Sequence, residues 1–205
     1  MSSLGVIDYG AGNLRSVLNT FSAAGYEGKL IRSVEDLEGI THLVLPGVGS
    51  FGDCANKLRA QGLEGPVKEW IANNRPFLGI CVGYQILFEE GEEDPGVPGL
   101  GIFKGKVVRF PESDLKVPHM GWNPITEVDS DSLMWQGMGE TPYFYFVHSY
   151  YPIPLDESLI SATCEYGEKF AAAIQKGNLM ATQFHPEKSQ KLGVHLLKNF
   201  MKIAE

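Results

Sequence analysis

The chain has 205 residues, of which 43% are hydrophobic and 20% charged, and its formal net charge is −8. This length predicts one globular domain, residues 1–205, that buries roughly 70% of the surface of its unfolded chain. The negative charge argues against nonspecific binding to nucleic acid or to acidic membranes. No apolar run reaches the roughly 18 residues that a membrane-spanning helix needs, so we expect no membrane association.

The N-terminus and the cysteines bear on the cellular compartment. Residues 1–5 hold no basic segment followed by a long apolar one, so no signal peptide is expected. Cys54, Cys81 and Cys164 are widely spaced, and an odd, sparse number of cysteines fits a reducing cytosol better than a disulfide framework. We therefore expect a cytoplasmic protein. The common metal and P-loop motifs are absent, so the sequence indicates neither a metal nor a nucleotide.

The first 89 residues alternate short apolar runs with helical patterns. Strands are predicted at residues 4–7, 27–31, 42–45 and 77–80, and helices at residues 14–24, 53–61, 63–73 and 83–89, with a helical turn at 34–37. This βα order predicts a parallel sheet with right-handed crossovers. Ligands bind at the carboxyl ends of the strands in such sheets, so the loops that follow the strands should share one edge.

Two of these loops are rich in glycine. Gly10 and Gly12 suggest a dinucleotide-binding fingerprint, but Arg15 stands where the third glycine would be, and a tight strand-to-helix turn is the simpler interpretation. Residues 46–52 are expected to be neither helix nor paired strand, because proline lacks an N–H and glycines permit positive φ. This second loop leaves backbone N–H groups free at a strand end.

The strongest single pattern surrounds Cys81. An apolar strand ends at this residue, Gly79 and Gly83 flank it, and a helical pattern follows at once. The arrangement matches the Gly-x-Ser-x-Gly nucleophile elbow with cysteine in place of serine. Small neighbours let the turn close around a strained nucleophile, and the helix N-terminus favours the thiolate. A buried, inert cysteine is the alternative.

A second pattern lies near the C-terminus, where a strand leads to His185, Pro186 and Glu187. Pro186 disfavours the helical region for His185, and the Glu187 carboxylate could set the tautomer of the imidazole. Together with Cys81 this is a nucleophile–base–orienter set, provided that the two strands are adjacent and parallel. A surface histidine at a strand end is the alternative. The remaining histidines and cysteines are interpreted as ordinary residues: His42, His119, His148, His195, Cys54 and Cys164.

The second half of the chain changes character. Most members of the acidic run at residues 89–94 are expected to lie in a solvated loop. Short alternating segments predict antiparallel or mixed strands at residues 105–110, 121–127, 142–147, 159–164, 171–175 and 179–184, before a last helix at 190–203. The predicted fold class is therefore α/β, a single domain with a central, mostly parallel sheet, flanking helices and extra antiparallel strands.

Taken together, these motifs resemble the class I (triad) glutamine amidotransferases. Within that family the chain looks most like the glutaminase subunits of imidazole glycerol phosphate synthase, an enzyme of histidine biosynthesis. The residues that carry the likeness are 8–13, 46–49, 79–85, 118–123, 145–150 and 183–189. One departure is Tyr84, where these subunits usually have methionine.

The resemblance implies a reaction. The Cys81 thiolate would attack the side-chain amide of L-glutamine, giving a thioester and ammonia, while His185 moves the protons and Glu187 orients the imidazole. Backbone N–H groups at Val82 and in the loop containing Val48 and Gly49 would bind the oxyanion. The substrate-binding residues would be Gly47, Gln85, Glu93, Ser149 and Tyr150.

The resemblance also implies a partner. Ammonia would pass to a (β/α)₈ cyclase subunit in a heterodimer, with Asn13, Trp122 and Lys188 at the interface and with no cofactor or metal in this chain. Three alternatives stay open at this point. They are a triad glutaminase subunit for pyridoxal phosphate, anthranilate or surface-sugar amination, a γ-glutamyl peptidase, and a non-enzymatic regulatory subunit with a degenerate site.

Overall fold

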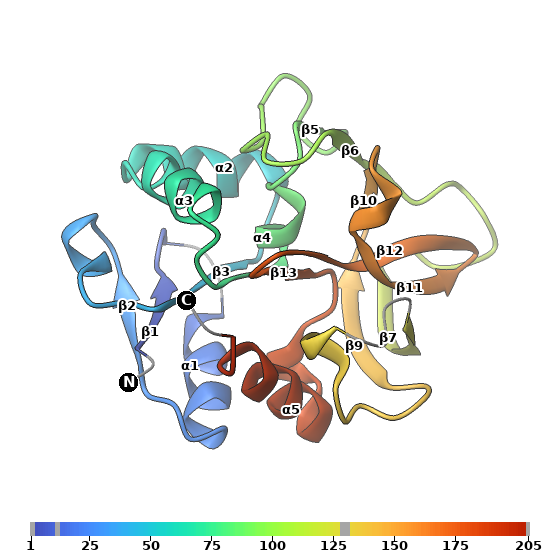
Figure 1. Ribbon diagram of the computed structural model, residues 1–205. Coiled ribbons are helices and arrows are strands. Elements are labelled where there is room, and N and C mark those ends of the chain that lie inside the picture. The colour runs from blue at the N-terminus through green and yellow to red at the C-terminus, as the bar shows by residue number, and fades with distance from the viewer. Residues whose placement is uncertain (1–2, 11–12, 128–131, 204–205) are drawn as a thin grey trace.

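A computed structural model describes residues 3–10, 13–127 and 132–203. Over these residues the main sheet has eight strands in the order β2-β1-β3-β4-β13-β12-β11-β8 (Figure 1). Their bounds are β1 Leu4–Ile7, β2 Gly28–Ile31, β3 His42–Gly47, β4 Phe77–Cys81, β8 Thr126–Glu127, β11 Ile160–Tyr166, β12 Glu168–Lys176 and β13 Leu179–Thr182. Neighbouring strands pair in parallel along the order from β2 to β13. From there on, β13 with β12, β12 with β11 and β11 with β8 pair antiparallel. This confirms the predicted α/β class.

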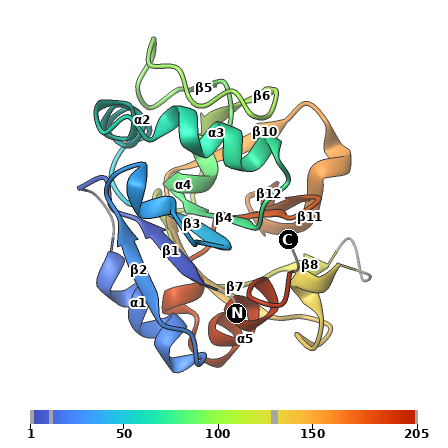
Figure 2. The same cartoon turned by 60° about the vertical axis from the view of Figure 1, so that its left-hand side comes forward.

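Helices cover both faces of the sheet (Figures 1 and 2). Helices α1 (Leu14–Ala23) and α5 (Gln190–Phe200) lie on one face. The other face carries α2 (Phe51–Ala60), α3 (Glu64–Ala72) and the single turn α4 (Val82–Gln85). Because both faces are covered, β1 and β4 are buried along their whole length, which explains their continuous apolar sequences.

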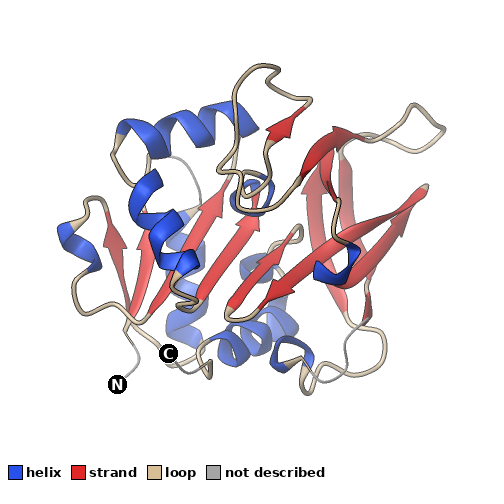
Figure 3. Ribbon diagram, turned by 45° about the horizontal axis from the view of Figure 1, so that its top comes forward, coloured by secondary structure: helices blue, strands red, loops and turns tan. Residues whose placement is uncertain are grey.

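Two smaller sheets lie beside the antiparallel strands (Figure 3). The first joins β10 (Tyr150–Pro154), β6 (Gly105–Arg109) and β5 (Glu90–Gly91). The second pairs β7 (His119–Pro124) with β9 (Tyr143–His148). Single 3₁₀ turns complete the fold: η1 Glu35–Leu37, η2 Leu133–Trp135, η3 Glu157–Leu159 and η4 Pro186–Lys188.

Two sequence expectations about helix length and strands are wrong. The helix expected at residues 83–89 ends at Gln85, because the N–H groups after Ile86 do not make α-helical bonds. Those of Leu87 and Phe88 donate to carbonyls only three residues back, and that of Glu89 donates to the Gly105 carbonyl. The sequence also missed β10, whose prolines hide the strand pattern. Among the described strands β10 pairs with β6 alone, and proline is tolerated at such an edge.

The expectation for the loop at residues 46–52 is also wrong. Strand β3 continues through Pro46 and Gly47, which pair with the end of β4, and α2 begins already at Phe51. The Pro46 carbonyl accepts a hydrogen bond of 2.7 Å from the Tyr9 hydroxyl. Most acidic members of the run 89–94 are exposed, as expected: Glu89, Glu90 and Glu92. The other two accept hydrogen bonds from the first N–H groups of α2, Glu93 from Phe51 and Asp94 from Gly52. Carboxylates at a helix N-terminus are stabilising.

The close packing of α4 on β3 gives a first prediction. A Cβ built on Gly83 would lie 2.0 Å from the Leu45 carbonyl oxygen, whereas one on Gly65 in α3 meets nothing within 4 Å. We expect Gly83→Ala to lower the free energy of unfolding by about 2 kcal/mol or more, because backbone must move. The matched control Gly65→Ala should be neutral or stabilise by up to about 1 kcal/mol. Urea titration measures both, and equal effects of the two substitutions would contradict the packing described here.

Candidate active site

Cys81 stands at the last position of β4, in a conformation that L-residues avoid, with φ 55° and ψ −111°. The turn closes because three glycines leave no side chain in its way. A Cβ on Gly79 would lie 2.9 Å from the Gly83 carbonyl oxygen, and one on Gly47 would lie 2.4 Å from the Gly83 nitrogen. The thiol is 4% exposed and lies at the start of α4. The local sequence therefore builds the elbow that its pattern predicts.

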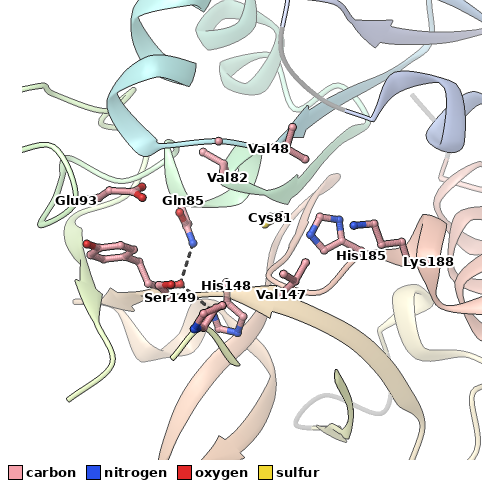
Figure 4. Close-up of a pocket in the computed structure, with 13 residues that line it drawn as sticks. Val48, Cys81, Val82, Gln85, Glu93, Val147, His148, Ser149, His185 and Lys188 are labelled. Atoms are coloured by element: carbon pink, nitrogen blue, oxygen red, sulfur yellow. Dashed lines mark hydrogen bonds between the residues drawn. The ribbon is translucent and has the colours of Figure 1, made fainter. Parts of the chain in front are cut away.

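His185 follows β13, which pairs in parallel with β4, so both strands bring their ends to the same edge. Its backbone is extended, with φ −102° and ψ 97°, as Pro186 requires. Its Nδ1 lies 2.7 Å from Glu187 Oε1, and both side chains are 2% exposed. Figure 4 shows the imidazole beside Cys81 among the residues that line a pocket.

Opposing effects act on the pKa of His185. Burial alone would lower it, but a neighbouring Cys81 thiolate and the Glu187 carboxylate favour the charged imidazole and raise the pKa to about 10. The imidazolium is therefore stable only while its two anionic neighbours keep their charge. This arrangement suits a base that takes the proton of a thiol and holds it until a leaving group needs it.

The pocket in front of Cys81 encloses about 390 Å³, which lies in the range of roughly 300–1,000 Å³ that small-molecule sites occupy. Its lining comes from β4, α4, the loop after β3, the acidic run and the ends of β7, β9 and β13 (Figure 4). The lining residues are Val48, Gly49, Cys81, Val82, Gln85, Glu93, Pro118, Val147, His148, Ser149, Tyr150, His185 and Lys188.

Most of the residues singled out by sequence lie at this pocket. All the expected oxyanion and substrate residues line it except Gly47, which packs against the Val82–Gly83 backbone instead. Glu187 stands behind His185 and does not line the pocket. Of the three expected interface residues, Lys188 lines the pocket while Asn13 and Trp122 do not, and all three are exposed at the surface.

Gln85 has a defined orientation in the pocket wall. Its Nε2 donates to the Tyr150 carbonyl at 2.9 Å and to Gln183 Oε1 at 3.0 Å, so both amide hydrogens are used. The Gln85 oxygen is then the atom that can accept from a ligand. Gln183 in turn approaches the Cys81 sulfur with its Nε2, at 3.7 Å.

Glu93 brings a carboxylate to the same wall. One oxygen accepts from the Phe51 N–H at 2.8 Å. Burial, together with the nearby carboxylate of Asp94, raises the pKa of Glu93, although the hydrogen bond from Phe51 opposes this. A cationic ligand group at the free oxygen would offset the cost of burying that charge.

Tyr84 follows Cys81 by three residues in sequence but does not line the pocket. Its side chain is fully buried, its hydroxyl donates to the Ala171 carbonyl at 3.4 Å, and its ring packs edge-on against Phe88. Burial raises the pKa of Tyr84, which keeps the phenol neutral. The residue is thus part of the packing beneath α4.

Sequence reasoning missed His148, which lines the pocket with its Nδ1 2.8 Å from the Tyr150 carbonyl. His119 lies directly behind it. The two residues are 29 positions apart and meet only through the register of β7 and β9, which no local pattern reveals. One feature of the sequence does point to a role for these histidines. Each interrupts an apolar stretch within a segment that carries the family likeness.

In the described ranges, no group of three or more His, Cys, Asp or Glu side chains is placed to hold a metal ion. No helix in those same ranges has the length and apolar character needed to cross a bilayer.

Comparison with known proteins agrees with this geometry. The sequence model of the family described as "Glutamine amidotransferase class-I" matches residues 5–204. The chain therefore belongs to the class-I glutamine amidotransferases. Solved structures share the fold: one titled "Crystal structure of glutamine amidotransferase" has a TM-score of 0.75 at 22% identity, covering 97% of this chain and 99% of its own.

Closer relatives are known from sequence. The chain is 46% identical to "Imidazole glycerol phosphate synthase subunit HisH" of Rhodopirellula baltica, over 95% of each chain. It is 48% identical to the protein of the same name from Syntrophotalea carbinolica, over 95% of this chain and 97% of that one. The chain thus spans nearly the full length of these relatives.

The buried histidine pair gives a pH prediction. Burial lowers the pKa of His119 to about 4 and that of His148 to about 3, so the unfolded chain binds more protons than the folded one between those values and about 6.5. Stability should fall as pH drops through this window, by on the order of 2 kcal/mol per histidine at pH 5. His185, whose pKa is raised, stays protonated in the folded chain and loses its proton in the unfolded chain only near pH 6.5, so it opposes this slope at the upper end of the window and adds almost none near pH 5.

Urea unfolding at pH 5, 6 and 7 measures this slope. The double variant His119→Phe/His148→Phe should show a flatter dependence than the native chain, and the control His195→Gln should keep the native slope. Parallel curves for the native chain and the double variant would contradict the assignment of two neutral, buried histidines.

Proposed function

We propose that this chain is the glutaminase subunit of an imidazole glycerol phosphate synthase. It hydrolyses L-glutamine to glutamate and ammonia and delivers the ammonia to a (β/α)₈ cyclase subunit in a heterodimer of histidine biosynthesis, located in the cytoplasm. The observation that carries the proposal is the strained Cys81 at a parallel-strand end beside the buried His185–Glu187 pair. The near full-length likeness to subunits of that name supports the choice within the family.

The reaction proceeds through a covalent intermediate. The Cys81 sulfur attacks the side-chain amide carbon, and His185 receives the thiol proton. The C–N bond then breaks, His185 gives its proton to the departing nitrogen, and ammonia and a γ-glutamyl thioester result. Water, deprotonated by His185, cleaves the thioester to glutamate and restores the thiol. Glu187 keeps the imidazole aligned through its bond to Nδ1.

Backbone groups stabilise the negative oxygen of the tetrahedral intermediates. The Val82 N–H stands at the start of α4, next to the nucleophile. On the facing loop the Val48 carbonyl accepts from Cys54 Sγ at 3.5 Å. Because N–H and C=O of one trans peptide point opposite ways, the Gly49 N–H points away from Cys54 and is the second donor. One such donor contributes roughly 3 kcal/mol in related sites.

The glutamine side chain must reach Cys81 while its charged end is held elsewhere in the pocket. The Gln85 oxygen and the free oxygen of Glu93 are acceptors for the α-ammonium group. Ser149 and Tyr150 complete the opposite wall, where donors can meet the α-carboxylate. This division of charges fixes the orientation of a short amino acid.

An exposed apolar surface beside the pocket supports a protein partner. On β7 and β9, Met120, Trp122 and Tyr143 are 62%, 43% and 50% exposed. Trp122 packs edge-on against Tyr145, and Lys188 Nζ lies 5.8 Å from the centre of that same ring. Since Lys188 also lines the pocket, this surface is continuous with the site where ammonia forms. A cyclase seated here would receive ammonia without its release to water.

The activity itself is tested by a glutaminase assay of the chain alone and with a cyclase subunit and its nucleotide ligand. We expect ammonia production to rise when the cyclase and ligand are both present. Cys81→Ser should lower it by roughly a thousandfold or more, because a hydroxyl is a far weaker nucleophile here. Unchanged activity in Cys81→Ser, or no glutamine hydrolysis under either condition, would refute the proposal.

The partner surface is tested by Trp122→Ala and Lys188→Ala. We expect Trp122→Ala to weaken cyclase binding by about tenfold or more, because buried tryptophans dominate interface energies, and Lys188→Ala to lower coupled activity. Leu155→Ala is the matched control, since Leu155 is 72% exposed but follows β10 in a different sheet. Titration calorimetry against the cyclase gives the affinities. If both variants kept the native affinity for the cyclase and the native coupled activity, this surface would not be the cyclase interface.

A further inference from the structure

Two buried histidines form a polar pair within the wall of the pocket. His119 on β7 and His148 on β9 are register partners, and their side chains are 1% and 6% exposed. His119 Nδ1 lies 3.0 Å from His148 Nε2. The rings of Phe110, Phe146 and Phe170 surround both imidazoles. The proposed reaction assigns no role to this pair.

The hydrogen bonds of the pair run in one direction. The Tyr150 carbonyl can only accept, so His148 Nδ1, 2.8 Å away, carries a hydrogen. The apolar surroundings lower the pKa of His148, which is therefore neutral at pH 7 and accepts at Nε2. His119 must then donate from Nδ1 and accept at Nε2, where the Asn123 amide is its partner. Each polar atom in the series has one defined role.

One end of this series is the glutamine site. The Tyr150 carbonyl accepts from His148 Nδ1 and also from Gln85 Nε2, so two donors fix its position. The same hydrogen bond determines that Gln85 presents its oxygen to a ligand. The other end is Asn123, the neighbour in β7 of the exposed Trp122.

We propose that His119 and His148 are positioning residues for glutamine, which set the Tyr150 carbonyl and the Gln85 amide and join this wall of the pocket to the exposed edge of β7. The inference rests on the proposed glutaminase function and deepens it. Neither histidine touches the reacting atoms, so the pair governs how well glutamine is held rather than the rate of bond cleavage.

The expected loss of glutamine affinity follows from the hydrogen bond that His148 donates to the Tyr150 carbonyl. Without it the Tyr150 carbonyl keeps a single donor and Gln85 loses the fixed acceptor that orients its amide. Loss of one such buried hydrogen bond weakens the dependent interaction by about tenfold. We therefore expect KM for glutamine to rise about tenfold in His148→Phe while kcat changes little.

The test uses substitutions that separate the hydrogen bond from the shape. His148→Phe keeps a ring in the aromatic cluster but removes both nitrogens. His148→Asn restores a donor near the position of Nδ1, whereas His148→Gln places its amide near that of Nε2. We expect His148→Asn to recover much of the affinity for the substrate glutamine and His148→Gln not to recover it. Tyr166→Phe is the control for the cluster, because Tyr166 stacks on His119 but its hydroxyl donates to Lys116 outside the series.

6-Diazo-5-oxo-L-norleucine is a glutamine analogue that inactivates Cys81, and the concentration dependence of this inactivation measures affinity for the glutamine site without turnover. The rate of alkylation by iodoacetamide measures the reactivity of the Cys81 thiol alone. We expect the analogue to label the native chain saturably. In His148→Phe the concentration for half-saturation should be roughly tenfold higher, and the rate of reaction with iodoacetamide should be unchanged. No saturable labelling of the native chain would refute the proposed function. Native half-saturation in a folded His148→Phe would refute the positioning role alone.

A measurement on the native chain covers the case in which His148→Phe does not fold. Nitrogen NMR of ¹⁵N-histidine-labelled protein at pH 7 should show both residues as neutral imidazoles protonated at Nδ1. An Nε2–H tautomer or an imidazolium at His148 would break the directed series and overturn the inference.

Discussion

The close approach of three glycines around Cys81 is the constraint on which the rest of the site depends. Gly47, Gly79 and Gly83 bring β3, β4 and α4 so near to one another that a single added methyl group would meet backbone. This contact holds the cysteine at positive φ, sets the Val82 N–H beside the sulfur and brings the loop after β3 over the pocket. The strained turn is thus sustained by packing between buried backbones and not by the cysteine itself.

Histidines in this one protein experience opposite electrostatic environments. His185 is buried against the Cys81 thiolate and the Glu187 carboxylate, which together raise its pKa, whereas burial among aromatic rings lowers the pKa values of His119 and His148. The same side chain thus has a raised pKa in one place and a lowered pKa in another. Burial is common to all three residues, and the charge of the neighbours decides the outcome.

The sequence was informative where the determining contacts are local or follow from topology. The apolar runs gave β1 its bounds, and the βα order placed Cys81 and His185 on adjacent parallel strands. It failed where distant segments intervene. Helix α4 is short because the Glu89 N–H donates to the distant Gly105 carbonyl instead of to the preceding turn. The pairing of His119 with His148 depends on the register of two strands joined by a long connection. Neither effect leaves a periodic signal.

The exposure of Trp122 has an optical consequence. The chain has three tryptophans, and Trp70 and Trp135 are only 3% and 2% exposed, whereas Trp122 is 43% exposed. Emission from the two buried indoles is shielded from water, so changes in solvent polarity and small-molecule quenchers act chiefly on the third. The protein therefore carries an intrinsic fluorophore on its exposed apolar surface, and covering that surface shifts the emission to shorter wavelength without any added label.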